Sequence, residues 1–87
     1  MGTYSKNCIQ TFLKNQGQLF DEPVAATPQE AAEFLDEMMA VVVRTPREVF
    51  RYLEELGMDV SGLGKEDIDD IAEVFPLDDG TYLIVEG

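Results

Sequence analysis

The arginines are the residues of this sequence whose type and spacing most directly suggest binding chemistry. All three lie within residues 44–51, at Arg44, Arg47 and Arg51. Arg47 and Arg51 are four residues apart, so a helix would place them on one face. Because a guanidinium group donates paired hydrogen bonds to an oxyanion, the cluster predicts a clamp for carboxylates or other anions. The competing interpretation is local salt bridging, since Glu48 and Glu55 lie three and four residues from Arg51.

Tyr52 directly follows the last arginine and belongs to the same predicted interaction surface. Arginine and tyrosine are both enriched at protein interfaces. We therefore expect any protein contact, including a self-complementary one between two copies, at Arg44, Arg47, Arg51 and Tyr52. The alternative route to a homodimer is an exposed edge of the predicted sheet.

The acidic stretch "DVSGLGKEDIDD", residues 59–70, partly fits a twelve-residue calcium loop. The weak metal candidates Asp59, Asp67 and Asp70 take its positions 1, 9 and 12. Position 5 is Leu63, which has no side-chain oxygen, and position 12 lacks the bidentate glutamate that the loop requires. The competing interpretation is a helix over residues 65–72, whose first-turn acids favour the helix dipole.

The residue types that are missing exclude several chemistries. With no histidine and one cysteine, Cys8, the sequence holds no Ser-His or Cys-His pair and no zinc or iron–sulfur framework. No cofactor is predicted. Cys8 lies on the apolar stripe of a predicted helix, which indicates a packed, unreactive thiol. A carboxylate acid–base pair would need a cleft, and nothing in the sequence selects two acids for it.

The net charge of −12 is unevenly distributed along the 87 residues. Residues 1–20 contain two lysines and no acid, whereas every acidic side chain lies from Asp21 onward. An acidic body disfavours nucleic acid and anionic membranes, and it predicts a basic protein partner, cation attraction or simple solubility. The longest apolar run, residues 38–43, is too short to cross a bilayer. Without a signal-peptide pattern, and with one cysteine, a cytoplasmic protein is predicted.

The pattern Thr-Pro-x-Glu occurs twice, at residues 27–30 and 45–48. In each copy threonine suits a helix N-cap, proline suits the first turn, and glutamate can reach back to the N–H of the cap. Apolar residues then recur with helical spacing after both copies. The repeat therefore predicts two helix starts, and a Thr-Pro-directed kinase is the alternative reading.

The remaining elements follow from apolar spacing and turn residues. A helix is predicted within residues 4–16, ended by Gly17 at positive φ, followed by an extended loop at 18–26 and a strand at 40–43. Asp79-Gly80 predicts a two-residue type I′ hairpin that pairs Leu77 with Tyr82, Phe75 with Ile84 and Val74 with Val85. Pro76 assigns strand 73–77 to the sheet edge. Residues 82–85 are apolar on both faces, so they are expected inside the sheet beside 40–43.

These elements predict residues 1–87 to be a single acidic α+β domain, with a sheet of about three strands, a C-terminal hairpin and three to four covering helices. The sequence matches no family from which a function follows. The first hypothesis is a small non-enzymatic interaction or regulatory module. The alternatives are an acidic inhibitor or decoy that occupies a basic site on a partner, and a minimal enzyme that depends on carboxylates or a divalent cation.

Overall fold

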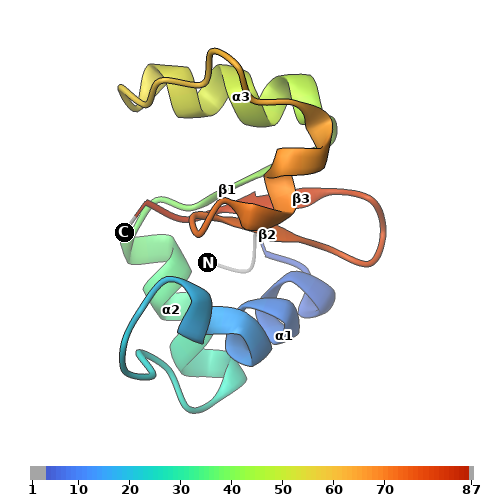
Figure 1. The fold of residues 1–87 in the computed structure, drawn as a ribbon. Coiled ribbons are helices and arrows are strands. Elements are labelled where there is room, and N and C mark those ends of the chain that lie inside the picture. Colours follow the sequence, from blue (N-terminus) through green and yellow to red (C-terminus); the bar gives the residue numbers. More distant parts are fainter. Residues whose placement is uncertain (1–3, 87) are drawn as a thin grey trace.

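The computed structural model describes residues 4–86, in which a three-stranded sheet lies between two layers of helices (Figure 1). Helices α1 (Lys6–Asn15) and α2 (Pro28–Glu37) cover one face of the sheet, and helix α3 (Pro46–Glu55) lies on the opposite side. The predicted α+β fold is confirmed. The remaining elements are the strands β1 (Val41–Val43), β2 (Val74–Pro76) and β3 (Tyr82–Ile84) and the 3₁₀-helices η1 (Gln16–Gln18) and η2 (Lys65–Asp70).

The sheet is antiparallel with the strand order β1-β3-β2, so β3 is the central strand, as its apolar composition predicts. Side chains alternate between the two faces along it: Leu83 contacts the α1/α2 layer, whereas Ile84 contacts the layer of α3. This alternation explains why the central strand is apolar at successive positions, because both of its faces are buried.

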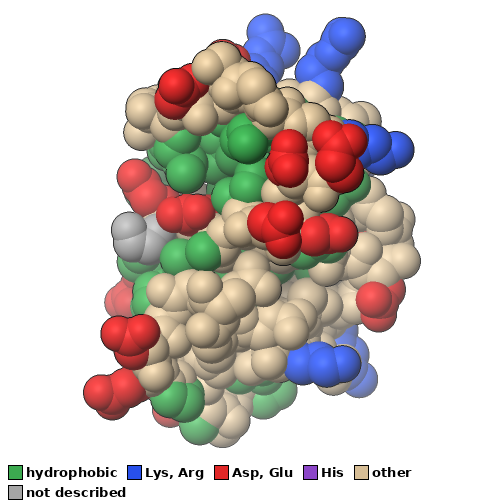
Figure 2. All heavy atoms as spheres, viewed as in Figure 1, with side chains coloured by type: hydrophobic (Ala, Val, Ile, Leu, Met, Phe, Trp, Pro, Cys, Tyr) green, Lys and Arg blue, Asp and Glu red, His purple; other side chains and the backbone are tan. Residues whose placement is uncertain are grey.

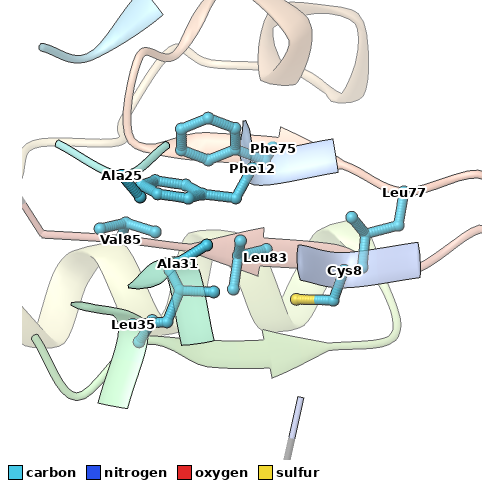
Figure 3. Close-up of a cluster of buried hydrophobic side chains, with 10 residues drawn as sticks. Cys8, Phe12, Ala25, Ala31, Leu35, Phe75, Leu77, Leu83 and Val85 are labelled. Atoms are coloured by element: carbon cyan, nitrogen blue, oxygen red, sulfur yellow. The ribbon is translucent and has the colours of Figure 1, made fainter. Parts of the chain in front are cut away.

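Phe12 is at the centre of the larger core, between α1, α2 and the sheet (Figure 3). Its ring centroid lies 5.3 Å from that of Phe75, 5.7 Å from Phe34 and 6.4 Å from Phe20. These separations are within the range in which aromatic rings attract beyond simple area burial. The aromatic cluster therefore joins helices α1 and α2 and the loop between them to strand β2.

The predicted helix starts are present at both Thr-Pro-x-Glu copies. Thr27 and Thr45 accept the backbone N–H groups of Glu30 and Glu48, each at 3.2 Å. The partner of each glutamate carboxylate differs from the prediction by one residue. Glu48 accepts the N–H of Arg44 and Glu30 accepts that of Ala26, each at 2.8 Å, and in both copies this N–H belongs to the residue before the cap. The threonine caps are extended, and this extended backbone brings the preceding N–H within reach of the carboxylate.

The end of α1 differs from the sequence prediction. Gly17 does not adopt a positive φ, and the chain instead tightens into η1. Gln16, at the start of η1, is buried and holds the following loop: its amide donates to Leu13 O and Ala25 O, and its Oε1 accepts from the N–H groups of Val24 and Ala25. The segment predicted as a helix over 65–72 is the shorter η2, residues 65–70.

The predicted hairpin register is wrong by one residue. Val74 pairs with Ile84 and Phe75 with Leu83, because the loop contains three residues rather than two. The N–H of Gly80 donates to Leu77 O at 3.1 Å, and Gly80 has φ +87°. This is the three-residue hairpin loop in which the four-residue turn, residues 77–80, ends in a glycine at positive φ. The type I′ turn predicted for Asp79-Gly80 is therefore absent, since Asp79 does not adopt a positive φ.

The positive φ of Gly80 makes this residue the most sensitive point of the hairpin turn. Gly80→Val should lower the free energy of unfolding by about 1–3 kcal/mol, because a β-branched side chain is strained at that φ. Gly17→Val is the matched control, since a Cβ added to Gly17 would meet no neighbouring atom and its φ is not positive. Thermal unfolding of both variants measures the difference, and equal melting temperatures would contradict the turn geometry.

The outer edge of β1 offers few free backbone groups. The N–H of Val85 bonds Glu73 O, and the N–H of Leu77 bonds Thr81 O. In β3 the odd-numbered residues therefore direct their backbone N–H and C=O groups toward β2, and the even-numbered residues direct theirs toward β1. Val42 therefore points its N–H and C=O away from the sheet. On either side, Ala40 O accepts the Tyr4 hydroxyl at 2.7 Å, Ala40 N–H bonds Leu35 O, and Arg44 N–H bonds the Glu48 carboxylate.

The opposite edge, at β2, is similarly occupied. The N–H of Val74 bonds Ile71 O at 3.0 Å, and Val74 O accepts the Gln18 amide at 2.9 Å. Pro76 has no N–H to donate. Both edges of the sheet are therefore largely closed to another strand by the chain's own groups.

Candidate functional site

Helix α3 presents the predicted arginines to solvent because its inner positions are fixed by the core. Val49 and Leu53 are fully buried and pack in one cluster with Ile68, Val74 and Ile84. Arg47, Arg51 and Glu54, which are exposed, lie on the other side of the helix. In Figure 2 basic side chains project outward from the α3 end of the molecule. The amphipathic spacing of α3 thus creates a charged outer face.

An open hollow of about 570 Å³ lies on this outer face and is lined by Arg47, Phe50, Arg51 and Glu54. We call these four residues the arginine face. They recur at i, i+3, i+4 and i+7 and form one stripe along α3. Phe50 is half-buried, and its ring gives the hollow an apolar part beside the two arginines. The arrangement suits a ligand that has both a carboxylate and an apolar group.

Arg51 also borders a second hollow, of about 180 Å³, which is lined by Val43, Glu48, Tyr52 and Glu55. The structure therefore brings three of the four predicted interaction residues, Arg47, Arg51 and Tyr52, around two adjacent hollows. The side chain of Arg44 is exposed and lines neither of them.

The salt-bridging interpretation assigns Glu48 and Glu55 to Arg51. Both glutamates lie beside Arg51 in the smaller hollow. One carboxylate oxygen of Glu48, however, accepts the Arg44 backbone N–H at 2.8 Å. Glu48 is therefore held at the start of the helix, and this contact limits its freedom to follow the Arg51 side chain.

The weak metal candidates have local hydrogen-bond partners. Asp59 accepts the N–H of Ser61 at 3.0 Å and its hydroxyl at 2.7 Å, and these bonds hold the pKa of Asp59 below its usual value. Asp67 accepts the N–H of Gly64 at 2.8 Å, and Asp70 is exposed. Among residues 4–86, no three acidic or cysteine side chains lie close enough together to hold a metal ion. The polar side chains of residues 59–67 therefore cap a turn and the start of η2.

The Cys8 thiol is buried in the α1/α2 core, as its place on the apolar stripe predicts. Burial, with a smaller contribution from the negative charge of Asp79, raises the pKa of Cys8 from 9.0 to about 11. A thiol with this pKa is almost entirely protonated at neutral pH and is a poor nucleophile.

The raised pKa of Cys8 predicts a stability change at alkaline pH. Since the folded pKa exceeds the unfolded one, the stabilisation is complete below the unfolded value of 9.0 and is lost as pH rises through about 11. The stability advantage of the wild type over Cys8→Ala should therefore shrink between these two pH values. Urea unfolding of both proteins at a series of pH values measures this advantage. A difference in unfolding free energy that stays constant with pH would contradict the raised pKa of Cys8.

A third hollow, of about 280 Å³, lies between α1 and the hairpin and bears on the enzyme hypothesis. It is polar and contains a single carboxylate, that of Asp78, beside the Lys14 ammonium group. A carboxylate-based acid–base mechanism needs two carboxyl groups that converge on one substrate. This hollow supplies only one, so it gives that hypothesis no pair of acids.

Two residues that line the larger hollow, Phe50 and Glu54, are not among the predicted interaction residues. Phe50 packs against the core cluster of α3, and its ring also lines the outer hollow. Their spacing could have identified them, because Phe50 and Glu54 lie three and seven residues after Arg47 and so share its side of the helix.

Among residues 4–86, every helix is too short or too polar to span a bilayer. Comparisons of the chain with protein-family models, with curated proteins and with solved structures give no significant match.

Proposed function

We propose that this protein is a small non-enzymatic interaction module that binds an acidic surface of a protein partner through the arginine face of α3. The observation that carries the proposal is the hollow that Arg47 and Arg51 line together with Phe50 and Glu54. Interfaces place arginine and aromatic side chains at their centres, where each contributes strongly to binding. The rim residues Tyr52 and Glu55 continue this surface beside Arg51.

The local charge, rather than the net charge of −12, decides which partner approaches this face. At physiological salt the charges of the distant acidic residues are screened beyond about 8 Å. The lining of the hollow itself contains two guanidinium groups and one carboxylate, that of Glu54, so a group that enters it meets a local excess of positive charge. A carboxylate-bearing partner is the chemistry they recognise.

The acidic body by itself predicts a basic partner and the inhibitor or decoy hypothesis. That function calls for acids arrayed on one face. Exposed acids occur on α2 at Glu33 and Glu37 and, on the other side of the sheet, on η2 at Glu66 and Asp69. These acids lie on both sides of the sheet rather than on one, so they lend the decoy hypothesis no specific support.

Affinity purification of the tagged chain from its source cells tests the proposed function. The double variant Arg47→Ser/Arg51→Ser should lose a stoichiometric, identified partner that the wild type retains. Lys6→Ser/Lys14→Ser is the matched control, since it removes the same charge from α1. Hydrogen exchange on the purified complex should show protection at residues 47–54. Equal recovery of every partner with both double variants would overturn the proposal.

A further inference from the structure

The hollow between α1 and the hairpin has a polar lining that the fold itself does not use. Helix α1 supplies Asn7, Gln10, Thr11 and Lys14, which recur at i, i+3, i+4 and i+7, and the hairpin supplies Asp78. None of the hydrogen bonds found among residues 4–86 involves these five side chains. Their donors and acceptors are therefore available to a molecule that enters the hollow.

The buried positions of α1 determine where this polar stripe lies. Cys8 and Phe12 are buried in the α1/α2 core, so the neighbouring residues Asn7 and Thr11 lie at the margin of the core, where each is half-buried. A half-buried polar side chain keeps only part of its contact with water. A ligand that bonds Asn7 and Thr11 therefore displaces less water from them than from fully exposed groups, which lowers the cost of binding.

The two charged groups of the hollow have opposite signs. The Lys14 ammonium group offers three N–H donors and no acceptor, whereas the Asp78 carboxylate only accepts. A ligand satisfies both when it carries a carboxylate for Lys14 and an ammonium group for Asp78. Such a zwitterion has no net charge, so the protein's net charge of −12 does not repel it as it repels a free anion.

We propose that this hollow binds a free α-amino acid with an uncharged polar side chain, its carboxylate held by Lys14 and its ammonium group by Asp78. The amides of Asn7 and Gln10 and the Thr11 hydroxyl both donate and accept, which suits a ligand side chain that ends in an amide. L-glutamine and L-asparagine have this chemistry. Among residues 4–86, the lining of the hollow includes no aromatic ring, so it offers no stacking platform to a nucleobase.

The size of the hollow agrees with a ligand of this class. Its volume of about 280 Å³ lies just below the roughly 300–1,000 Å³ of pockets for drug-sized molecules. Lys14 and Asp78 are exposed, so water and salt weaken their pairing with the ligand, and we expect binding in the micromolar to millimolar range. The site is independent of the proposed function, because α1 lies across the sheet from α3 (Figure 1).

Amide NMR spectra of the whole chain during titrations with L-glutamine and with L-asparagine test the binding. Saturable shifts should centre on residues 7–15 and 76–78, with residues 47–54 unchanged. Two analogues test the recognition of the zwitterion: N-acetyl-L-glutamine lacks the ammonium group, and L-glutamine α-amide lacks the carboxylate. Each should bind about tenfold more weakly than L-glutamine, because a charge-assisted hydrogen bond is lost.

Substitutions in the hollow connect each ligand group with its residue. Lys14→Met and Asp78→Asn should each weaken L-glutamine binding about tenfold. Lys14→Met should then bind L-glutamine α-amide as well as it binds L-glutamine, and Asp78→Asn should no longer distinguish L-glutamine from its N-acetyl derivative. Lys6→Met and Asp69→Asn are the matched controls, since they make the same changes at exposed positions outside the hollow and should bind like the wild type. All four substituted side chains are exposed, so the fold is retained.

Each outcome decides the inference. Saturable binding that Lys14→Met and Asp78→Asn weaken, and that the controls retain, supports the amino-acid site. The absence of saturable shifts at millimolar concentration of either amino acid overturns it, as does binding that either substitution in the hollow leaves unchanged. Equal shifts with sodium phosphate would show a simple anion site at Lys14, and saturation by D-glucose alone would show a carbohydrate site, so either result overturns the amino-acid assignment. None of these results bears on Arg47 and Arg51, so the proposed function is tested separately.

Discussion

Phe12→Ala should lower the free energy of unfolding by about 3–5 kcal/mol. The side chain is completely buried, and its ring contacts Phe20, Phe34 and Phe75 from three separate segments of the chain. Its removal leaves a cavity that these segments cannot fill without moving apart. Since a domain of this length has a total stability of about 4–13 kcal/mol, the variant loses a large share of it.

Urea unfolding followed by circular dichroism measures this loss. Phe12→Leu is the milder companion variant, which should retain much of the stability because it keeps an apolar side chain in the site. Val24→Ala serves as a control from the same side of the molecule, since Val24 is 37% exposed and should change the stability little. A Phe12→Ala midpoint close to that of Val24→Ala would show that the aromatic cluster does not hold the layers together.

Gln16→Met should destabilise the protein by about 2–4 kcal/mol although the two side chains have similar size. The Gln16 amide donates at 3.1 Å to Leu13 O and at 3.0 Å to Ala25 O, while its oxygen accepts from Val24 at 2.7 Å and from Ala25 at 3.2 Å. Methionine fills the space without replacing these bonds. Each buried backbone group that loses its partner costs about 1–3 kcal/mol, reduced where water enters.

Gln10→Met is the matched control, because Gln10 is an exposed residue of α1 and the substitution is chemically identical. Hydrogen exchange should also report the change locally, with faster exchange at the N–H groups of Val24 and Ala25 in Gln16→Met. Unchanged exchange there, with equal unfolding midpoints for the two variants, would mean that the loop is held by its apolar side chains instead.

Features that depend on a few neighbouring residues were predictable from the sequence. The caps of α2 and α3 follow from threonine and proline at fixed offsets, and the central position of β3 follows from apolar residues on both of its faces. The exposure of Arg47 and Arg51 follows from the buried positions Val49 and Leu53, whose spacing sets the inner face of the helix.

Features that depend on tertiary contacts were not predictable in the same way. The hairpin register depends on whether the loop contains two residues, 79–80, or three residues, 78–80. The pairing of Phe75 with Leu83 in the larger core selects the second, because a slip of one residue would turn β2 over. Gln16 offered no sequence signal, since its partners at Val24 and Ala25 come together only when the loop folds back.

The closed sheet edges have a consequence for the behaviour of the chain at high concentration. Strand β1 belongs to the apolar run of residues 38–43, a composition typical of segments that template fibril growth when a neighbour adds to an open edge. Glu48 is the acidic residue in the first turn of α3, where it favours the helix dipole, and its carboxylate also accepts the Arg44 N–H beside β1. A substitution of Glu48 would therefore loosen a helix and uncover an aggregation-prone strand in a single step.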